Sequence, residues 1–210
     1  MRKLLLIGGG GHCLSVLDSV IASGLYDDIG IIDHRDSEPF LGISVIGDDD
    51  DIPRLKEEGW AEAFVTVGSV GDTAIRRRLY TMVRDYGLSV PTIIDPSATI
   101  ARGCTINEGT FIGKHAVVNA GTVIGTCCIV NTGAIIEHEC ALGDFSHISP
   151  AAALCGRVRI GTDTHIGAGT VVRQQIVIGN NVLVGAGSVV LSDITSGEKA
   201  YGNPCIVISS

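Results

Sequence analysis

The hydrophobic positions in the second half of the chain follow a period of six. When residues 95–190 are counted in sixes, the last residue of every hexad is aliphatic. The residue two positions earlier is small in most hexads, and Val158, Ile176 and Val182 are the exceptions. A large inward side chain beside a small one is what a triangular coil needs, because side chains from three faces meet inside it. The repeat therefore predicts a parallel β-helix.

Three hexads form one coil of such a helix. The repeat then gives about five coils, and a strand spacing of about 4.8 Å makes the column about 25 Å tall. The aliphatic hexad ends are Ile100, Ile106, Ile112, Val118, Ile124, Val130, Ile136, Leu142, Ile148, Leu154, Ile160, Ile166, Val172, Ile178, Val184 and Val190. Glycine follows many of them, and we interpret it as the residue that allows a tight corner. These glycines are Gly113, Gly125, Gly143, Gly161, Gly167, Gly179 and Gly185.

The first half of the chain alternates between short apolar runs and segments with a helical pattern. The apolar runs cover residues 3–7, 29–32 and 63–67, and the helical patterns cover 15–22, 54–58 and 73–86. This alternation predicts a small parallel sheet of Rossmann type. Helix signals vanish beyond Pro91. We therefore expect an α/β domain, Rossmann-like, at residues 1–90 and an all-β domain with a C-terminal tail at 91–210.

Composition narrows the class of protein. The 210 residues are 45% hydrophobic, which is enough for a buried core. A net charge of −8 argues against a nucleic-acid partner, because phosphate binding needs a clustered basic surface. No apolar stretch reaches the about 18 residues of a membrane span, and no signal cleavage site follows the first apolar run, so we expect a cytoplasmic protein. The seven cysteines contain no CxxC pair, and we interpret them as reduced thiols.

The repeat of sixteen hexads in one phase resembles that of the hexapeptide-repeat acyltransferases. The alternative is a generic β-solenoid without activity. The resemblance implies a left-handed coil and a homotrimer with active sites between subunits. A short column also leaves flat faces exposed, and association would cover them.

One histidine stands out inside the regular repeat. His138 lies between Glu137 and Glu139, at a corner position rather than in the aliphatic core. A nearby carboxylate makes the neutral ring a stronger base, and an amine or hydroxyl attacking a thioester must lose a proton. His138 is therefore a candidate catalytic base, with Glu139 as its partner. A solvated surface pair is the alternative interpretation of the same residues.

The motifs resemble those of the sugar acyltransferase family that includes the sialic acid O-acetyltransferase NeuD and the UDP-4-amino-sugar N-acetyltransferase PglD. The resemblance covers nearly the whole chain. It is carried by the glycines and histidine at 8–12, by the Ile-Glu-His-Glu-Cys segment at 136–140, and by the Ser-His-Ile-Ser segment at 146–149. It implies that His138 is the base, that Glu139 adjusts it, and that His147 contacts acetyl-CoA. His165, one coil above His147 on the same face, is interpreted as a stacking residue.

The same resemblance implies where the other substrate binds. The glycine loop follows a strand and precedes a helix, so its amides could face a phosphate, although a tight turn explains it equally well. In the family this loop and the acid after the second strand hold the nucleotide-sugar. The residues implied are Gly10, Gly11, His12, Asp33 and Gly68. His34 follows Asp33 where relatives often carry an acid or amide, which leaves the nucleobase preference open.

The coenzyme is expected along the column and the tail. Register with the family places Ala168 and Ala186 in the pantetheine groove. The tail at 201–210 resembles the Gly-x-Pro-Ala tail of hexapeptide enzymes, but Cys205 replaces the alanine and Ile206 stands where a basic residue is common. Phosphate contacts must then come from elsewhere. The candidates are Arg157, Arg159, Arg173 and Lys199.

A zinc site is not expected. The γ-class carbonic anhydrases share the coil and hold zinc with three histidines, two of them five residues apart. Here the gaps between His115, His138, His147 and His165 do not match that pattern. The expected cosubstrate is acetyl-CoA, with no metal.

These observations predict an acetyl-CoA-dependent N-acetyltransferase acting on a UDP- or dTDP-linked 4-amino sugar in surface glycan biosynthesis. O-acetylation of sialic acid or another sugar is an alternative within the enzymes. A non-catalytic sugar-binding scaffold is an alternative of a different class. The expected partners are the nucleotide-sugar, acetyl-CoA and two further copies of the chain.

Overall fold

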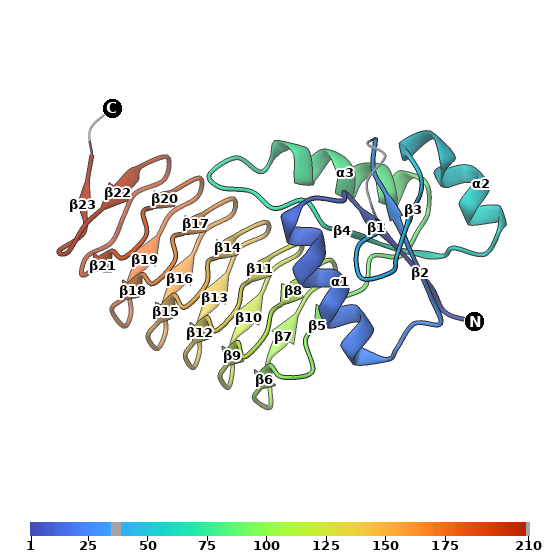
Figure 1. Cartoon of the computed structure of the whole chain (residues 1–210). Coiled ribbons are helices and arrows are strands. Elements are labelled where there is room, and N and C mark those ends of the chain that lie inside the picture. Colours follow the sequence, from blue (N-terminus) through green and yellow to red (C-terminus); the bar gives the residue numbers. More distant parts are fainter. Residues whose placement is uncertain (35–38, 209–210) are drawn as a thin grey trace.

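The computed structural model describes residues 1–34 and 39–208, which form two parts that pack against each other (Figure 1). One part is α/β and contains a parallel sheet with strand order β3-β2-β1-β4. Its strands are β1 (Lys3–Ile7), β2 (Asp28–Ile32), β3 (Val45–Gly47) and β4 (Glu62–Val65). Its helices are α1 (Gly11–Ser23), the 3-10 helix η1 (Asp49–Asp51), α2 (Ile52–Glu57) and α3 (Ala74–Asp85).

The predicted alternation of strands and helices is confirmed. All three predicted strands and all three predicted helices are present, with bounds that differ by a few residues. Strand β3 was not expected, because its three residues are only half-buried and too few to give an apolar run.

The second part is a column of short strands arranged in three faces, and they pair in parallel except that β23 is antiparallel to β22. The first face carries β5 (Ile93–Ile94), β8 (Phe111–Ile112), β11 (Ile129–Val130), β14 (His147–Ile148), β17 (His165–Ile166), β20 (Leu183–Val184), β22 (Lys199–Tyr201) and β23 (Ile206–Val207). The second face carries β6 (Thr99–Ile100), β9 (Val117–Val118), β12 (Ile135–Ile136), β15 (Ala153–Leu154), β18 (Val171–Val172) and β21 (Val189–Val190). The third face carries β7 (Thr105–Ile106), β10 (Val123–Ile124), β13 (Ala141–Leu142), β16 (Arg159–Ile160) and β19 (Val177–Ile178).

Three corners join these faces, and we number them in chain order. The first corner leads from the first face to the second, the second corner from the second to the third, and the third corner back to the first. Residues one coil apart lie directly above one another, as His147 does above Ile129 and below His165. The parallel β-helix predicted from the repeat is confirmed.

The hexad ends fill the interior of the column. All of those from Ile112 onward are buried, and they form one continuous apolar core. Ile100 and Ile106 are only partly buried, because they belong to the first coil and have no coil beneath them.

The glycines that follow the hexad ends have a different role from the one expected. The left-handed corner position is taken by other glycines, such as Gly103 and Gly121 at φ 77° and 73°. At Gly143, by contrast, an added Cβ would lie 2.5 Å from the backbone nitrogen of Thr162 in the next coil. Interpreting these glycines as tight-corner residues was wrong, because they are needed where successive coils approach each other closely.

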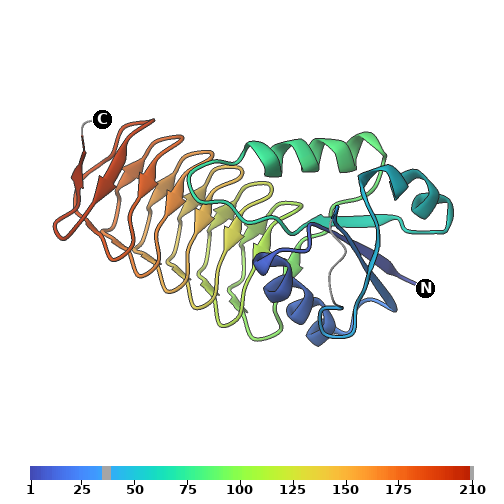
Figure 2. The ribbon, with the colours of Figure 1, turned by 45° about the horizontal axis from the view of Figure 1, so that its top comes forward.

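The α/β part packs on the first face at the N-terminal end of the column (Figures 1 and 2). Phe111 and Ile129 point outward from this face and join a buried cluster with Leu4, Leu6 and Val16 of the sheet and α1. Strands β22 and β23 lie at the far end of the column (Figure 1).

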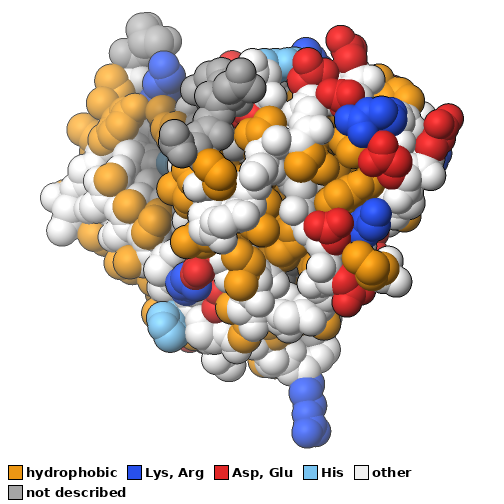
Figure 3. Space-filling model, turned by 45° about the vertical axis from the view of Figure 1, so that its right-hand side comes forward, with side chains coloured by type: hydrophobic (Ala, Val, Ile, Leu, Met, Phe, Trp, Pro, Cys, Tyr) orange, Lys and Arg blue, Asp and Glu red, His pale blue; other side chains and the backbone are white. Residues whose placement is uncertain are grey.

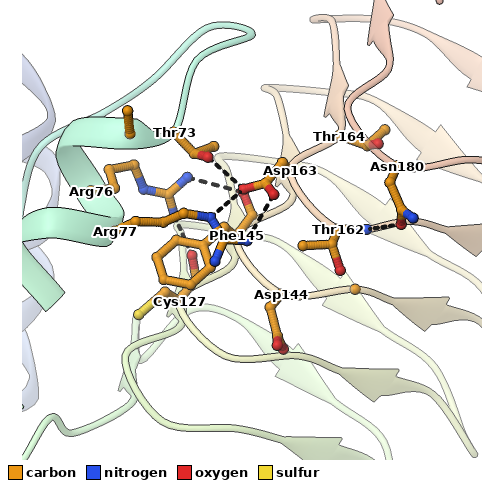
Figure 4. Close-up of polar contacts among 12 residues, drawn as sticks. Thr73, Arg76, Arg77, Cys127, Asp144, Phe145, Thr162, Asp163, Thr164 and Asn180 are labelled. Atoms are coloured by element: carbon orange, nitrogen blue, oxygen red, sulfur yellow. Dashed lines mark hydrogen bonds and ion pairs between the residues drawn. The ribbon is translucent and has the colours of Figure 1, made fainter. Parts of the chain in front are cut away.

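Helix α3 reaches over the third corner (Figure 4). The guanidinium of Arg76 is buried and donates hydrogen bonds to the main-chain oxygens of Cys127 and Phe145, which occupy the same corner position in successive coils. It also donates to the hydroxyl of Ser69 at 3.1 Å.

Asp163 occupies this corner position one coil above Phe145. Its carboxylate accepts two hydrogen bonds from Arg77, at 2.8 and 2.7 Å, and another from the hydroxyl of Thr73. Three successive coils are therefore tied to α3 and the segment before it.

Charged side chains of both signs are interspersed on the face of the molecule shown in Figure 3. Within residues 1–34 and 39–208, no helix is both long and apolar enough to cross a membrane.

Candidate active site

His138 lies on the second corner, just after β12, in the corner position that the sequence predicts. Its Nδ1 is 3.0 Å from Oε2 of Glu139. An ionised carboxylate only accepts hydrogen bonds, so Nδ1 carries the hydrogen and Nε2 keeps its lone pair. That arrangement leaves Nε2 able to take a proton from a substrate.

The imidazole of His138 rests against the main chain of Gly156, one coil above. A Cβ added to Gly156 would lie 2.5 Å from Nε2 of His138. The ring borders a hollow of about 110 Å³, which is also lined by Gly156, Arg157, Gln174 and Gln175. Glycine at 156 therefore makes room for the ring in this position.

Glu139 is held by Arg157 as well as by His138. Hydrogen bonds from Arg157 first, and from His138 second, lower the pKa of the Glu139 carboxyl. The partner of His138 is consequently ionised at neutral pH, as an acceptor for Nδ1 must be.

A larger cleft of about 510 Å³ runs along the first corner. It brings together all three residues predicted to contact the coenzyme, His147, Ala168 and Ala186, which lie in successive coils. Val70, from the segment after β4, and Tyr201, on β22, also line it. The α/β part and the tail thus both contribute walls to this cleft.

Both nitrogens of His147 have partners. Nδ1 donates to the main-chain oxygen of Ser69 at 2.9 Å, and Nε2 lies 3.4 Å from the side-chain amide of Asn131. Burial lowers the pKa of His147 to about 3, so the ring is neutral at pH 7. His165 contacts His147 edge to face at 4.8 Å between centroids and also lines the cleft, so its stacking role stays a prediction.

The predicted sugar-binding residues gather at the carboxyl ends of β1, β2 and β4. The amide of Gly9 donates to Oδ2 of Asp33 at 2.6 Å, which ties the glycine loop to the end of β2. Gly10 and Gly11 open α1, and a Cβ on either would meet nothing within 4 Å. The loop is therefore open to a ligand at its helix N-terminus.

His12 and Gly68 lie next to each other beside the glycine loop. The His12 ring contacts Phe111 edge to face, and burial, followed by the charge of Arg76, lowers its pKa to about 4. A Cβ on Gly68 would touch the Cβ of His12 at 3.4 Å. In this structure the His12 side chain therefore faces Phe111 of the column. The neighbouring His34 is exposed, and its Nε2 lies 3.5 Å from Oδ2 of Asp49.

Comparison with known proteins identifies the family. The model of the PglD N-terminal domain matches residues 3–83. The acetyltransferase domain of PglB from Neisseria gonorrhoeae FA1090 is 37% identical, with a TM-score of 0.93 over 99% of this chain and 100% of that chain. PerB from Caulobacter crescentus, solved in complex with CoA and GDP-perosamine, is 35% identical, with a TM-score of 0.93 over 100% of this chain and 98% of that chain. The chain belongs to the PglD family.

Membership of the PglD family confirms the resemblance inferred from the motifs. The relatives are acetyltransferases that share the fold over their whole length, so the column is the expected left-handed β-helix. WeeI from Acinetobacter baumannii AYE, at 16% identity and a TM-score of 0.67, shares the fold.

Some of the residues around His138 and around the cleft on the first corner were not predicted from the sequence. Gly156, Gln174 and Gln175 surround His138 but lie in later coils. Val70 lines the cleft and Ser69 bonds to His147, and both positions depend on how the α/β part packs on the first face. The described residues contain no group of three or more His, Cys, Asp or Glu side chains suited to hold a metal ion.

In one chain, the His138 region and the cleft occupy different corners. His138 lies on the second corner, whereas Ala168 and Ala186 lie on the first, and the second face separates them. A single chain therefore does not bring the candidate base and the predicted coenzyme residues together.

Proposed function

We propose that the chain transfers the acetyl group of acetyl-CoA to the amino group of a nucleotide-linked 4-amino sugar. The His138–Glu139 pair, with Nε2 free, carries this proposal. The column that bears it matches an N-acetyltransferase with CoA and GDP-perosamine bound, over the full chain.

In the proposed reaction the amine of the sugar attacks the thioester carbonyl. Nε2 of His138 takes the proton that the amine loses as the new C–N bond forms. The C–S bond then breaks, and the thiolate of CoA leaves and takes up the proton from Nε2, which returns His138 to its neutral form. Glu139 stays ionised and stabilises the imidazolium through Nδ1. Main-chain amides of the coil are proposed to bind the developing oxyanion.

The cleft on the first corner suits the proposed coenzyme arm. Its walls carry small or apolar side chains at Ala168, Ala186 and Val70. His147 is neutral and fixed by Ser69, so it can line the cleft without the cost of a buried charge. Coenzyme contacts from His147, Ala168 and Ala186 are part of this proposal.

The glycine loop is the proposed site of the nucleotide-sugar. The exposed amides of Gly10 and Gly11 at the start of α1 suit a diphosphate. We assign Asp33 to ordering the loop, together with His12 and Gly68 beside it. With a domain boundary near residue 90, the first domain would bind the nucleotide-sugar and the second would provide most of the coenzyme cleft. Both substrates carry charged phosphates that do not cross a bilayer unaided, which supports a cytoplasmic enzyme.

A homotrimer is the proposed assembly. The outward side chains of the second face form an apolar row: Val117, Ile135, Ala153, Val171 and Val189. Ile135 and Val171 are 40% and 41% exposed. If three copies place this row at a threefold axis, the second corner of each copy meets the first corner of the next. His138 of one chain would then face the cleft of its neighbour.

The test compares His138→Asn with His115→Asn, a control at an exposed histidine of the same column. Thiol release from acetyl-CoA is measured with UDP- and dTDP-linked 4-amino sugars, with GDP-perosamine and with free sialic acid. We expect His138→Asn to lose about 100-fold or more in kcat, and His115→Asn to match the wild type. An unchanged kcat in the His138→Asn variant would show that His138 is not the catalytic base. A wild type that binds a sugar without turnover supports a non-catalytic scaffold, and turnover with free sialic acid alone supports O-acetylation.

A further inference from the structure

Arg157 stands directly above Glu139 on the second corner and contacts its carboxylate at two points. Its Nε donates to Oε2 at 3.0 Å, and its Nη2 lies 3.4 Å from Oε1. His138 donates from Nδ1 to the same Oε2 at 3.0 Å. One carboxylate oxygen is thus shared between the proposed base and the guanidinium.

The geometry of the corner brings these side chains together. Glu139 and Arg157 take the same left-handed turn position in successive coils, with φ of 58° and 62°. Gly121 takes this position in the coil below, where an added Cβ would lie 3.5 Å from Cγ of Glu139. Gln175 takes it in the coil above Arg157, with φ of 62°. The stacking of successive coils therefore places the guanidinium of Arg157 next to the carboxylate of Glu139.

A single hydrogen bond to His138 would leave the Glu139 carboxylate free to rotate about its last torsion, which is soft. A guanidinium presents two parallel N–H groups that match the two oxygens of a carboxylate, so it fixes the plane of the group. The orientation of the carboxylate in turn sets the tilt of the imidazole, and hence the direction of Nε2.

We infer that Arg157 is a positioning residue, which orients Glu139 and through it the imidazole of His138. This inference rests on the proposed function, because it needs His138 to be the base. It also reassigns Arg157 from the candidates for the coenzyme phosphates, since its Nε and Nη2 donors already face Glu139.

The positive charge of Arg157 also has an electrostatic effect on His138, which opposes the benefit of positioning. A cation beside Glu139 weakens the attraction between that carboxylate and a protonated His138. The side chains of His138, Glu139 and Arg157 are all more than half exposed in the single chain, so this effect is screened by solvent. We therefore expect positioning to outweigh it.

The experiment is a double-mutant cycle measured by steady-state kinetics. Arg157→Gln and Arg157→Lys are each made in the wild type and in Glu139→Gln, and kcat and KM are determined for acetyl-CoA and for the amino sugar. Because small displacements of a catalytic group are costly, we expect kcat to fall about tenfold in both single variants, with KM changed by less than about twofold. In the Glu139→Gln background the same substitutions should have no further effect.

Arg102→Gln is the matched control. Arg102 is an exposed arginine on the same corner, two coils below His138. It should leave kcat and both KM values unchanged. Thermal unfolding of every variant shows that the chains are folded, and Arg157→Lys carries the test if Arg157→Gln does not fold.

Three outcomes would overturn the inference. A rise in KM for acetyl-CoA at constant kcat would make Arg157 a coenzyme contact. An equal fall in kcat with and without the Glu139 carboxylate would mean that Arg157 acts elsewhere, and an unchanged or higher kcat would remove its positioning role. The failure of the proposed function is recognised separately, by wild-type turnover that survives His138→Asn.

Discussion

At the scale of single residues, the orientation of the candidate base depends on residues at the same corner in the adjacent coil. His138 has its acidic partner next to it in sequence, but the surface on which its ring rests belongs to Gly156 in the coil above. The absence of a side chain at 156 is therefore part of how the ring is oriented.

Gly156→Ala should impair catalysis without unfolding the chain. The new methyl would stand 2.5 Å from Nε2 of His138, and the imidazole must swing away from it. We expect kcat to fall by about 100-fold, since displacement of about 1 Å can cost that much. KM for both substrates should change little. Steady-state kinetics and thermal unfolding check this, and wild-type kcat in the Gly156→Ala variant would show that the ring does not use this surface.

The sequence could predict His138 but not its surroundings, and the reason differs from residue to residue. His138 was recognisable because two acids flank it in an otherwise regular ladder. Gly156 and Arg157 lie 18 residues beyond His138 and Glu139, so the repeat itself contains the information that they are neighbours. The bond between His147 and Ser69 has no such periodic signal, because it forms only when the α/β part packs on the column.

At the scale of elements, α3 and the third corner form a joint between the two parts. Arg76 and Arg77 are consecutive on the helix, and together they contact three coils. Their helix was predictable from its charge pattern, and the corner was predictable from the repeat. Their pairing was not, because nothing local in either segment specifies the other.

Asp163 should make this joint sensitive to acid. Burial alone would raise the pKa of its carboxyl, but hydrogen bonds from Arg77 and Thr73 outweigh burial and lower it. A lowered pKa in the folded state means that its stabilisation is complete above the unfolded value of about 3.9 and is lost as the pH falls below it.

Asp163→Asn should therefore lower the free energy of unfolding by about 1 to 2 kcal/mol at pH 7, from the loss of charged hydrogen bonds. Its stability should also decline less steeply than that of the wild type between about pH 4 and pH 2. Urea unfolding across this range is the measurement. Asp85→Asn, at the exposed end of α3, is the control. Parallel pH profiles for Asp163→Asn and the wild type would contradict the assignment.

At the scale of the whole molecule, the three corners have different tasks. The third corner holds the α/β part, the first carries the cleft, and the second carries the candidate base. The first face is partly covered by the α/β part, while the second keeps an exposed apolar row. The period of six predicts the same inward aliphatic positions on all three faces. The faces differ in the side chains that point outward.

In the proposed homotrimer, placing base and cleft on separate corners of one chain has a genetic consequence: two inactive alleles should complement each other. His138→Asn removes the base, and Ala186→Trp fills the cleft while leaving His138 intact. In a threefold ring, every mixed trimer contains one junction where an intact His138 meets an intact cleft. Equal co-expression gives about three quarters mixed trimers, so about one quarter of wild-type activity should return. Purified mixed trimers without activity would place both groups of each site on the same chain.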